Sequence, residues 1–181
     1  MKHCLNIGCG RDIKKSTEHN KWINMDKSKI EGVDICHDLD NVPWPFKDNY
    51  FDEIYAKDSI EHLKDLFNTM KEIHRISKKG AKVRIIVPYW HSSAAFYTNH
   101  NYFFNIDSLK SFTESDRSYD SFYGFKLEKV DLIPSKIGWL IPPIPIPKFL
   151  FPNVKDLRHL FSYLFGEIIL KIYFELEVIN K

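Results

Sequence analysis

The stretch Cys4-Leu5-Asn6-Ile7-Gly8-Cys9-Gly10, close to the N-terminus, decides the fold. Residues 4–7 have the pattern of a short buried β-strand. The Gly-x-Gly turn that follows lets the backbone approach a ligand closely, because glycine has no side chain in the way. In open α/β sheets, ligands bind at the carboxyl ends of the strands, where the strand order reverses. The stretch therefore predicts a first strand that ends at a ligand site.

Short apolar segments bounded by turn or breaker residues predict four more strands, at residues 22–25, 33–36, 51–56 and 82–87. Before the last of them, apolar residues recur every three or four positions from Ile60 to Ile76, as one face of a helix requires. We expect this helix to end at Lys78-Lys79-Gly80, where cations in the last turn precede a glycine. The alternation of strand and helix predicts a mostly parallel sheet that is covered on both faces.

The C-terminal part of the chain has a different pattern. An apolar helical stripe over residues 157–165 follows a predicted N-cap at Asn153, with Asp156 at the third helical position. Residues 172–178 alternate apolar and polar side chains, as a strand with one buried face does, and residues 125–133 resemble its partner. The predicted fold is an α/β, Rossmann-like, doubly wound and mostly parallel sheet with an antiparallel C-terminal strand, in three layers (α/β/α). We expect one domain over residues 1–181.

Composition narrows the functional classes. The length of 181 residues suits one domain, and a net charge of +2 is too small to indicate electrostatic capture of nucleic acid. The three cysteines, Cys4, Cys9 and Cys36, have no spacing that indicates a disulfide framework or a zinc site. No apolar run is long enough to span a bilayer, and the N-terminus lacks a signal-peptide pattern. We expect a cytoplasmic protein with no bound metal.

Three acidic residues, Asp26, Asp38 and Asp58, follow three successive strands. A carboxylate after the second strand can accept hydrogen bonds from both hydroxyls of a ribose. A carboxylate after the third strand can accept the amino proton of an adenine. Together they describe a site for a cofactor that contains adenosine.

The glycine turn discriminates between such cofactors. A dinucleotide fingerprint needs a third glycine and a helix N-terminus for the pyrophosphate, and Ile13 stands where that glycine would be. S-adenosylmethionine has no phosphate, and an acidic rim suits its positively charged sulfonium. We therefore expect S-adenosylmethionine as the cofactor, with a nicotinamide-dependent oxidoreductase as a weaker alternative.

The first half of the chain resembles the class I S-adenosylmethionine-dependent methyltransferases of the type 11 group. The matching segments occur in the family's order and spacing; they are residues 5–10, 22–26, 37–39, 42–46, 51–56, 60–63, 72–80 and 83–88. The resemblance implies roles for the residues of the predicted site. Gly8, Cys9 and Gly10 would line the methionine end of the cofactor, and Asp58 would border its sulfonium. Asp26 would hold the ribose. Asp38 would hold the adenine amino group, and Leu39 would pack on the adenine ring. Asn6 departs from the family, since many relatives carry an acidic residue there.

The resemblance implies an enzyme that transfers a methyl group. Transfer from a sulfonium needs mainly alignment of the reactants, whereas a hydroxyl acceptor also needs a general base. His91 and His100, which follow the fifth strand, are the candidate bases, and the alternative is that they are hydrogen-bonded wall or cap residues. We expect a small-molecule or glycan-type acceptor and no nucleic acid. A non-catalytic S-adenosylmethionine-binding module is the alternative.

One apolar, proline-rich segment, residues 139–152, fits none of these elements. We expect it to cover the acceptor side of the cofactor as a lid, together with an aromatic cluster formed by Tyr97, Tyr102, Phe103 and Phe104. So apolar a segment needs a surface to bury it. The alternatives are a contact in a dimer and a peripheral contact with a membrane.

Overall fold

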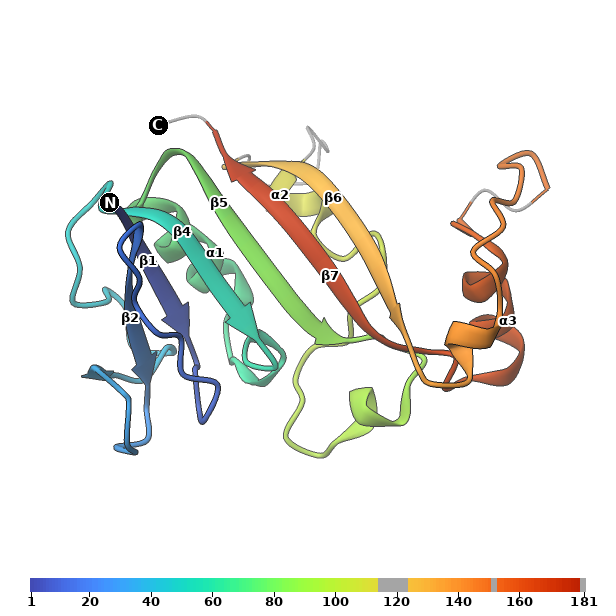
Figure 1. Cartoon of the computed structure of the whole chain (residues 1–181), viewed down its shortest axis with the longest axis horizontal. Coiled ribbons are helices and arrows are strands. Elements are labelled where there is room, and N and C mark those ends of the chain that lie inside the picture. The colour runs from blue at the N-terminus through green and yellow to red at the C-terminus, as the bar shows by residue number, and fades with distance from the viewer. Residues whose placement is uncertain (114–123, 151–152, 180–181) are drawn as a thin grey trace.

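The computed structural model describes residues 1–113, 124–150 and 153–179 (Figure 1). Within these residues a seven-stranded sheet has the order β3-β2-β1-β4-β5-β7-β6. Its strands are β1 (Lys2–Ile7), β2 (Asn20–Asp26), β3 (Ile35–Cys36), β4 (Phe51–Lys57), β5 (Ser77–Pro88), β6 (Phe125–Pro134) and β7 (Ile169–Val178). The helices are α1 (Leu66–Ile76), α2 (Lys110–Thr113) and α3 (Leu157–Phe165), with 3-10 turns η1 (Ile60–His62), η2 (Ser93–Phe96) and η3 (Gly138–Leu140).

The strand directions confirm the predicted fold class. Strands β1 to β5 pair in parallel, β7 pairs antiparallel with β5, and β6 pairs antiparallel with β7. Leu5 of β1 lies opposite Ile23 on one side and Ile54 on the other, so the strand order reverses at β1. Ligands bind at such switch points in open α/β sheets. The fold therefore places its site at the carboxyl ends of β1 and β4.

The predicted helix over residues 60–80 is wrong at both ends. The chain forms the 3-10 turn η1 and then extends at Leu63, and α1 begins only after Asp65, whose carboxylate accepts a hydrogen bond from the backbone N of Asn68 (2.9 Å). Helix α1 ends at Ile76, because Ser77 already pairs with Phe51 of β4. The cations expected at the helix end lie in β5, where Lys78 pairs with Asp52 (2.7 Å). Sheet pairing thus overrides the local end signal.

Helix α3 covers the predicted apolar stripe, but it begins three residues later than the predicted cap implies. Asp156, not Asn153, is the N-cap residue, and its carboxylate accepts a hydrogen bond from the backbone N of His159 (2.9 Å). An aspartate in this position satisfies one of the free N–H groups of the first turn.

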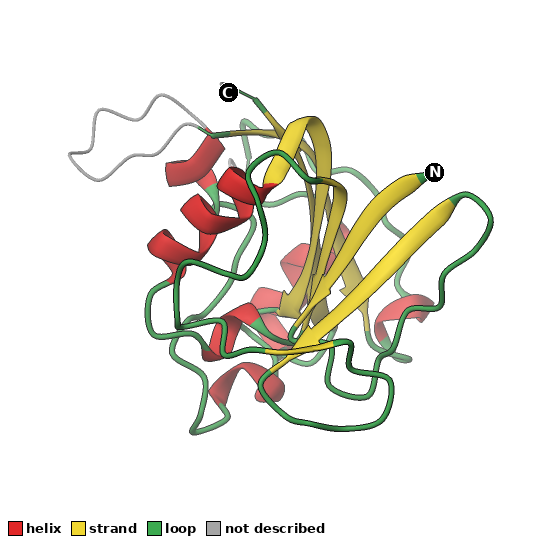
Figure 2. Cartoon of the chain, turned by 90° about the vertical axis from the view of Figure 1, so that its left-hand side faces the viewer, coloured by secondary structure: helices red, strands yellow, loops and turns green. Residues whose placement is uncertain are grey.

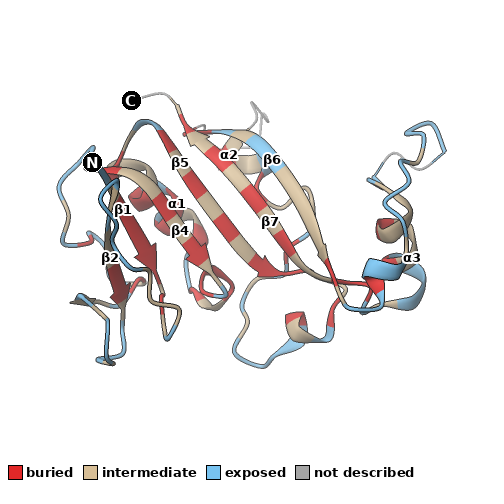
Figure 3. Cartoon of the chain, in the orientation of Figure 1, coloured by how far each residue is buried: buried red, intermediate tan, exposed pale blue. Residues whose placement is uncertain are grey.

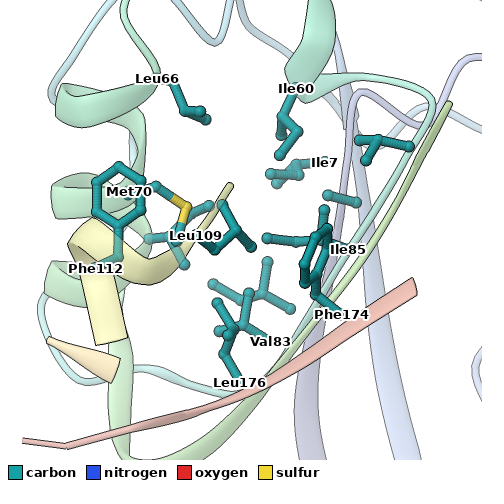
Figure 4. Close-up of a cluster of buried hydrophobic side chains, with 14 of the residues drawn as sticks. Ile7, Ile60, Leu66, Met70, Val83, Ile85, Leu109, Phe112, Phe174 and Leu176 are labelled. Carbon is teal, nitrogen blue, oxygen red and sulfur yellow. The ribbon is translucent and has the colours of Figure 1, made fainter. Parts of the chain in front are cut away.

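One face of the sheet carries the apolar core. Figure 4 shows Val83, Ile85, Phe174 and other strand residues pointing toward side chains of α1 and α2, among them Met70. Figure 3 shows buried and intermediate residues alternating along β5 and β7, as strands with one buried face require. Burying each large apolar side chain contributes about 1.5–3 kcal/mol, so this face supplies most of the stability.

The opposite face of the sheet is polar. Arg84 of β5 pairs with Glu53 of β4 (2.5 Å) and Glu175 of β7 (3.2 Å), and Lys82 pairs with Glu177 (3.2 Å). Residues 8–19, between β1 and β2, run as an irregular loop, and Figure 2 shows most helical turns on one side of the sheet. The expected covering of both faces is therefore unequal. Cross-strand ion pairs let the second face remain partly solvated.

The proline-rich segment lies at the far edge of the sheet. Residues 139–150 and α3 extend beyond β6 and β7 in Figure 1, on the right, away from the carboxyl ends of β1 and β4. The segment is tied to α3 by a hydrogen bond from the backbone N of Leu157 to the carbonyl of Ile144 (2.9 Å). Leu140 and Phe149 are each 83% exposed. In the described ranges, none of the helices combines the length and the apolar character needed to cross a membrane.

A buried polar pair joins β5 to α3, and we expect it to make folding pH-dependent. His159 is fully buried, lies 2.8 Å from the hydroxyl of Tyr89, and accepts a hydrogen bond on Nδ1 from the backbone N of Lys155 (3.0 Å). Burial lowers the pKa of His159, so the ring stays neutral in the folded chain while it takes up a proton in the unfolded chain. Stability is then complete above about pH 6.5 and falls below it, by up to about 1.4 kcal/mol per pH unit. Denaturant unfolding at pH 7.5 and 5.5 measures this.

The matched variant is His159→Gln, which keeps a neutral polar side chain but cannot titrate. We expect its unfolding free energy to change less between the two pH values than that of the unmodified chain. Equal pH dependence in the two proteins would contradict this assignment.

Candidate functional site

A pocket of about 380 Å³ lies at the carboxyl ends of β1, β2 and β4, where the strand order reverses. This size is within the range of small-molecule sites. Its lining residues come from the loops after these strands and after β3, and from a loop that follows η2; they are Gly8, Asp26, Lys27, Asp38, Leu39, Asp40, Asp58, Ser59, His62, Leu63 and Asn99. Five residues that the sequence predicted for a cofactor, Gly8, Asp26, Asp38, Leu39 and Asp58, thus lie around one cavity.

Gly8 has no room for a side chain. Its φ is +57°, and a Cβ atom added there would lie 2.4 Å from the Cβ of Ser59. The absent side chain brings the loop after β1 against the loop after β4. The Ser59 hydroxyl at this junction is buried and has no hydrogen-bond partner among the described residues. At this part of the pocket wall, the glycine backbone is therefore close-packed, and the Ser59 hydroxyl has no hydrogen-bond partner among the described residues.

Asp26 is held in a fixed orientation. Its Oδ2 accepts a hydrogen bond from the backbone N of Gly10 (2.8 Å), and its Oδ1 accepts one from the backbone N of Ser28 (2.8 Å). Each carboxylate oxygen can accept a further hydrogen bond, so the side chain remains able to bind a ligand. The same contacts tie the glycine turn to the end of β2.

The loop after β3 is anchored by Trp44, whose side chain is buried and only 2% exposed. The indole Nε1 of Trp44 donates to the carbonyl of Leu39 (3.1 Å), and its backbone N donates to Glu72 of α1 (2.6 Å). Asp38 accepts a hydrogen bond from the backbone N of Asp40 (3.1 Å). The proline-flanked segment around Trp44 therefore positions Asp38 and Leu39 at the pocket.

Asp58 and Glu61, on the loop after β4, have opposite environments. Asp58 forms an ion pair with Lys171 of β7. Glu61 is only 1% exposed, and neither of its carboxylate oxygens has a hydrogen-bond partner among the described residues. Burial raises the pKa of Glu61 to about 7.

Two histidines meet next to Glu61. Nδ1 of His62 lies 3.0 Å from the carbonyl of Asn99, and Nδ1 of His100 lies 3.2 Å from the carbonyl of Ala95. The ring centroids are 4.6 Å apart. Burial and the neighbouring His62 lower the pKa of His100. His62 lines the pocket, and the ring of His100 contacts that of His62 without lining the pocket itself.

The other predicted site residues lie elsewhere. Nδ1 of His91 contacts the carbonyl of Ser162 in α3, and His91 is not among the residues that line the pocket. Cys9 is buried, which raises the pKa of its thiol to about 11, and Gly10 contacts Asp26 without lining the pocket. No described residue of 139–150 lines the pocket, so the lid expected from the sequence does not cover it in this structure.

The predicted aromatic cluster does not act as a unit either. Phe104 is buried in the core, and the hydroxyl of Tyr102 bonds to the loop before α1, where it accepts from Leu66 N and donates to the Lys64 carbonyl (both 3.1 Å). Tyr97 and Phe103 are more than half exposed.

Sequence reasoning assigned no role to several lining residues, namely Lys27, Asp40, Ser59, Leu63 and Asn99. Leu63 ends the segment 60–63 that resembles the family, and Ser59 lies just before this segment, next to Asp58. Asn99 carried no sequence signal. It lies 37 residues beyond His62 in the chain, and only the packing of its loop against His62 brings it to the pocket.

The comparisons with known proteins agree with this geometry. Residues 10–85 match a family model described as a methyltransferase domain. A sterol 4-C-methyltransferase of Caenorhabditis elegans is 33% identical over 44% of this chain. The match spans only 29% of that relative's length.

Solved structures share the fold over nearly the whole chain. A SAM-dependent methyltransferase from Archaeoglobus fulgidus has a TM-score of 0.64 at 15% identity, with 97% of this chain and 86% of that one covered. A complex of the Haloferax volcanii Trm112 methyltransferase activator with a methyltransferase gives 0.61 at 17% identity, covering 99% and 83%. The [4+2]-cyclase SpnF gives 0.59 at 14% identity, covering 97% and 74%. Since a cyclase has this fold too, the reaction has to be argued from the site.

Proposed function

We propose that this chain, which carries a class I S-adenosylmethionine-dependent methyltransferase domain, transfers the methyl group of S-adenosylmethionine to a small-molecule acceptor. The observation that carries the proposal is the convergence of Gly8, Asp26, Asp38, Leu39 and Asp58 on one pocket at the switch point of the sheet. When bound, the cofactor supplies a methyl carbon that is activated by a positively charged sulfur.

The residues around the pocket fit this cofactor. In the proposed arrangement Asp26 accepts the ribose hydroxyls, Asp38 accepts the adenine amino proton, and Leu39 packs on the adenine ring. Gly8, Cys9 and Gly10 form the turn at the methionine end, where Gly8 lines the pocket while Cys9 and Gly10 support the turn. The Ser59 hydroxyl has no hydrogen-bond partner among the described residues, and a small movement of the pocket wall would let a bound group reach it.

The charge of the pocket favours a cation. Four aspartates, Asp26, Asp38, Asp40 and Asp58, are among the lining residues, against one lysine, Lys27, and the charge of Asp58 is shared with Lys171. In the proposed arrangement Asp58 borders the sulfonium, where a negative charge stabilises the cofactor more than its neutral product. This difference would help the product to leave after transfer.

Asn6, which departs from the family pattern, is already engaged. Its Nδ2 donates to the carbonyl of Asp12 (2.7 Å) and to Oδ1 of Asn24 (3.0 Å), and the residue is 1% exposed. We therefore propose that Asn6 shapes the turn from inside and does not contact the cofactor amine.

The acceptor side is proposed to lie near His62 and His100. Of the two histidines predicted as bases, His100 adjoins the pocket wall through His62, whereas His91 packs against α3. The relative from Caenorhabditis elegans acts on a sterol, which supports a small-molecule acceptor here.

Calorimetric titration tests the choice of cofactor. We expect S-adenosylmethionine and S-adenosylhomocysteine to bind, and NAD not to bind, because the glycine turn leads into an irregular loop and offers a pyrophosphate no helix N-terminus. Tighter binding of NAD than of S-adenosylhomocysteine would refute the proposal. Binding of the cofactor without transfer to any small molecule or glycan would indicate a non-catalytic binding module.

A further inference from the structure

Glu61, His62 and His100 come together from two loops that are distant in sequence. Each offers one potential ligand atom, and these atoms lie within 4.8 Å of one another. The Glu61 side chain is the unusual member, because its carboxylate is buried and has no hydrogen-bond partner among the described residues. A buried carboxylate is costly unless it is paired or coordinates a metal ion.

Both histidines are oriented as metal ligands usually are. A carbonyl only accepts hydrogen bonds, so the contacts with Asn99 and Ala95 place a proton on Nδ1 of His62 and of His100. The lone pair of each ring then lies on Nε2. Histidines that bind metals commonly donate their other ring N–H to a carbonyl in this way, which fixes the tautomer and the ring orientation.

The backbone holds the two loops together. Asn101 donates from its backbone N to the carbonyl of Glu61 (2.7 Å) and from Nδ2 to the carbonyl of His62 (2.9 Å). These contacts join the loop after β4 to the loop that carries His100. The cluster is thus preorganised by bonds that do not use its own ligand atoms.

We propose that Glu61, His62 and His100 bind one divalent transition-metal ion beside the cofactor pocket. Two imidazole nitrogens and one carboxylate oxygen are a ligand set found for zinc and other first-row metals, and three protein ligands leave coordination positions open. In a tetrahedral site, two bonds of about 2.0–2.2 Å hold their ligand atoms roughly 3.3–3.6 Å apart. The ligand atoms, which lie within 4.8 Å of one another, therefore need to close by up to about 1.5 Å, and rotation of the side chains supplies such a movement.

The metal site would give the proposed methyl transfer a way to activate its acceptor, and this role rests on the proposed function. His62 lines the pocket, so an ion held by it would lie at the side where the acceptor is expected. A bound metal ion lowers the pKa of an oxygen ligand, so an acceptor hydroxyl would lose its proton to solvent water. Its oxygen would then form the bond to the methyl carbon while the methyl–sulfur bond breaks and its electron pair stays on sulfur. No histidine would be needed as a base, and His100 would act as a ligand. From the sequence we expected no bound metal, because the cysteines have no metal-site spacing. The proposed site contains no cysteine, so that pattern could not reveal it.

The test measures metal binding directly, with chelator-treated chain and either MnCl₂ or ZnCl₂. By calorimetry, and by the loss of the free Mn²⁺ signal in electron paramagnetic resonance, we expect one ion per chain. Glu61→Gln and His100→Asn are expected to weaken binding at least about tenfold, since even outer-shell changes cost that much. His19→Gln, at an exposed histidine, is the matched control and should bind as the unmodified chain does.

A second readout separates a ligand from a structural residue. Mn²⁺ should raise the melting temperature of the unmodified chain and of His19→Gln, but not that of the Glu61 and His100 variants. Titration with S-adenosylhomocysteine in metal-free buffer reports the cofactor site independently, and the variants should retain it. No binding of either metal below about 1 mM, or equal binding by all four proteins, would overturn the metal site. Metal binding without cofactor binding would instead refute the proposed function.

Discussion

Replacing Gly8 with alanine is expected to destroy the cofactor site and to destabilise the fold. The φ of +57° costs a residue with a Cβ about 1–2 kcal/mol. The added Cβ would also lie 2.4 Å from the Cβ of Ser59, so the two loops must separate, at a further cost of about 1–3 kcal/mol. We expect S-adenosylhomocysteine binding to become undetectable by calorimetry, and the free energy of unfolding to fall by about 2–5 kcal/mol in all.

Gly80→Ala is the matched control for this prediction. Gly80 also has a positive φ, of +80°, but a Cβ added there meets no atom within 4 Å. It lies in β5, away from the pocket lining. We expect this variant to lose only the backbone part of the stability and to bind S-adenosylhomocysteine normally. Full cofactor binding by Gly8→Ala would show that the turn after β1 is not the cofactor loop.

Replacing Asp26 with alanine should have the second-largest effect. If this carboxylate accepts the ribose hydroxyls, its loss removes charge-assisted hydrogen bonds worth about 1.5–3 kcal/mol of cofactor affinity. The variant also leaves the backbone N–H groups of Gly10 and Ser28 without their acceptor, which loosens the turn. We expect S-adenosylhomocysteine to bind roughly 10- to 150-fold more weakly by calorimetry.

Two further variants sharpen this test. Asp26→Asn keeps one acceptor oxygen without the charge, so its affinity should fall between those of Asp26→Ala and the unmodified chain. Asp131→Asn removes a carboxylate from β6 that does not line the pocket, and should leave affinity unchanged. An Asp26→Ala variant with normal affinity would mean that the ribose binds elsewhere.

Many of the residues that line the pocket were predictable, because short local patterns in the sequence identify them. A short apolar run followed by Gly8 and Gly10 indicates a strand that ends in a close turn. An acidic residue after a strand, such as Asp26, indicates a polar group at the sheet edge. Since parallel strands all end at the same edge, these one-dimensional signals suffice to bring Asp26, Asp38 and Asp58 to one pocket.

The ends of α1 were not predictable from such signals. The apolar period continues through Leu63, yet the chain extends there, where Asn101 and Tyr102 bond to the loop. At the other end, the helix-stop signal around Gly80 lies inside β5, because pairing with β4 already begins at Ser77. Local propensity amounts to a fraction of a kcal/mol per residue, and tertiary pairing readily overrides it.

The sequence by itself determined the fold class, the ligand turn after the first strand and the acidic character of the pocket, because each depends on residues that are neighbours in the chain or on a rule common to all parallel sheets. Only the tertiary structure decided the rest. His62 and His100 are brought together by a loop that packs back on the site, and the proline-rich segment lies at the far edge of the sheet because β6 and β7 carry it there. Contacts between distant residues depend on packing, and no periodic pattern in the chain records them.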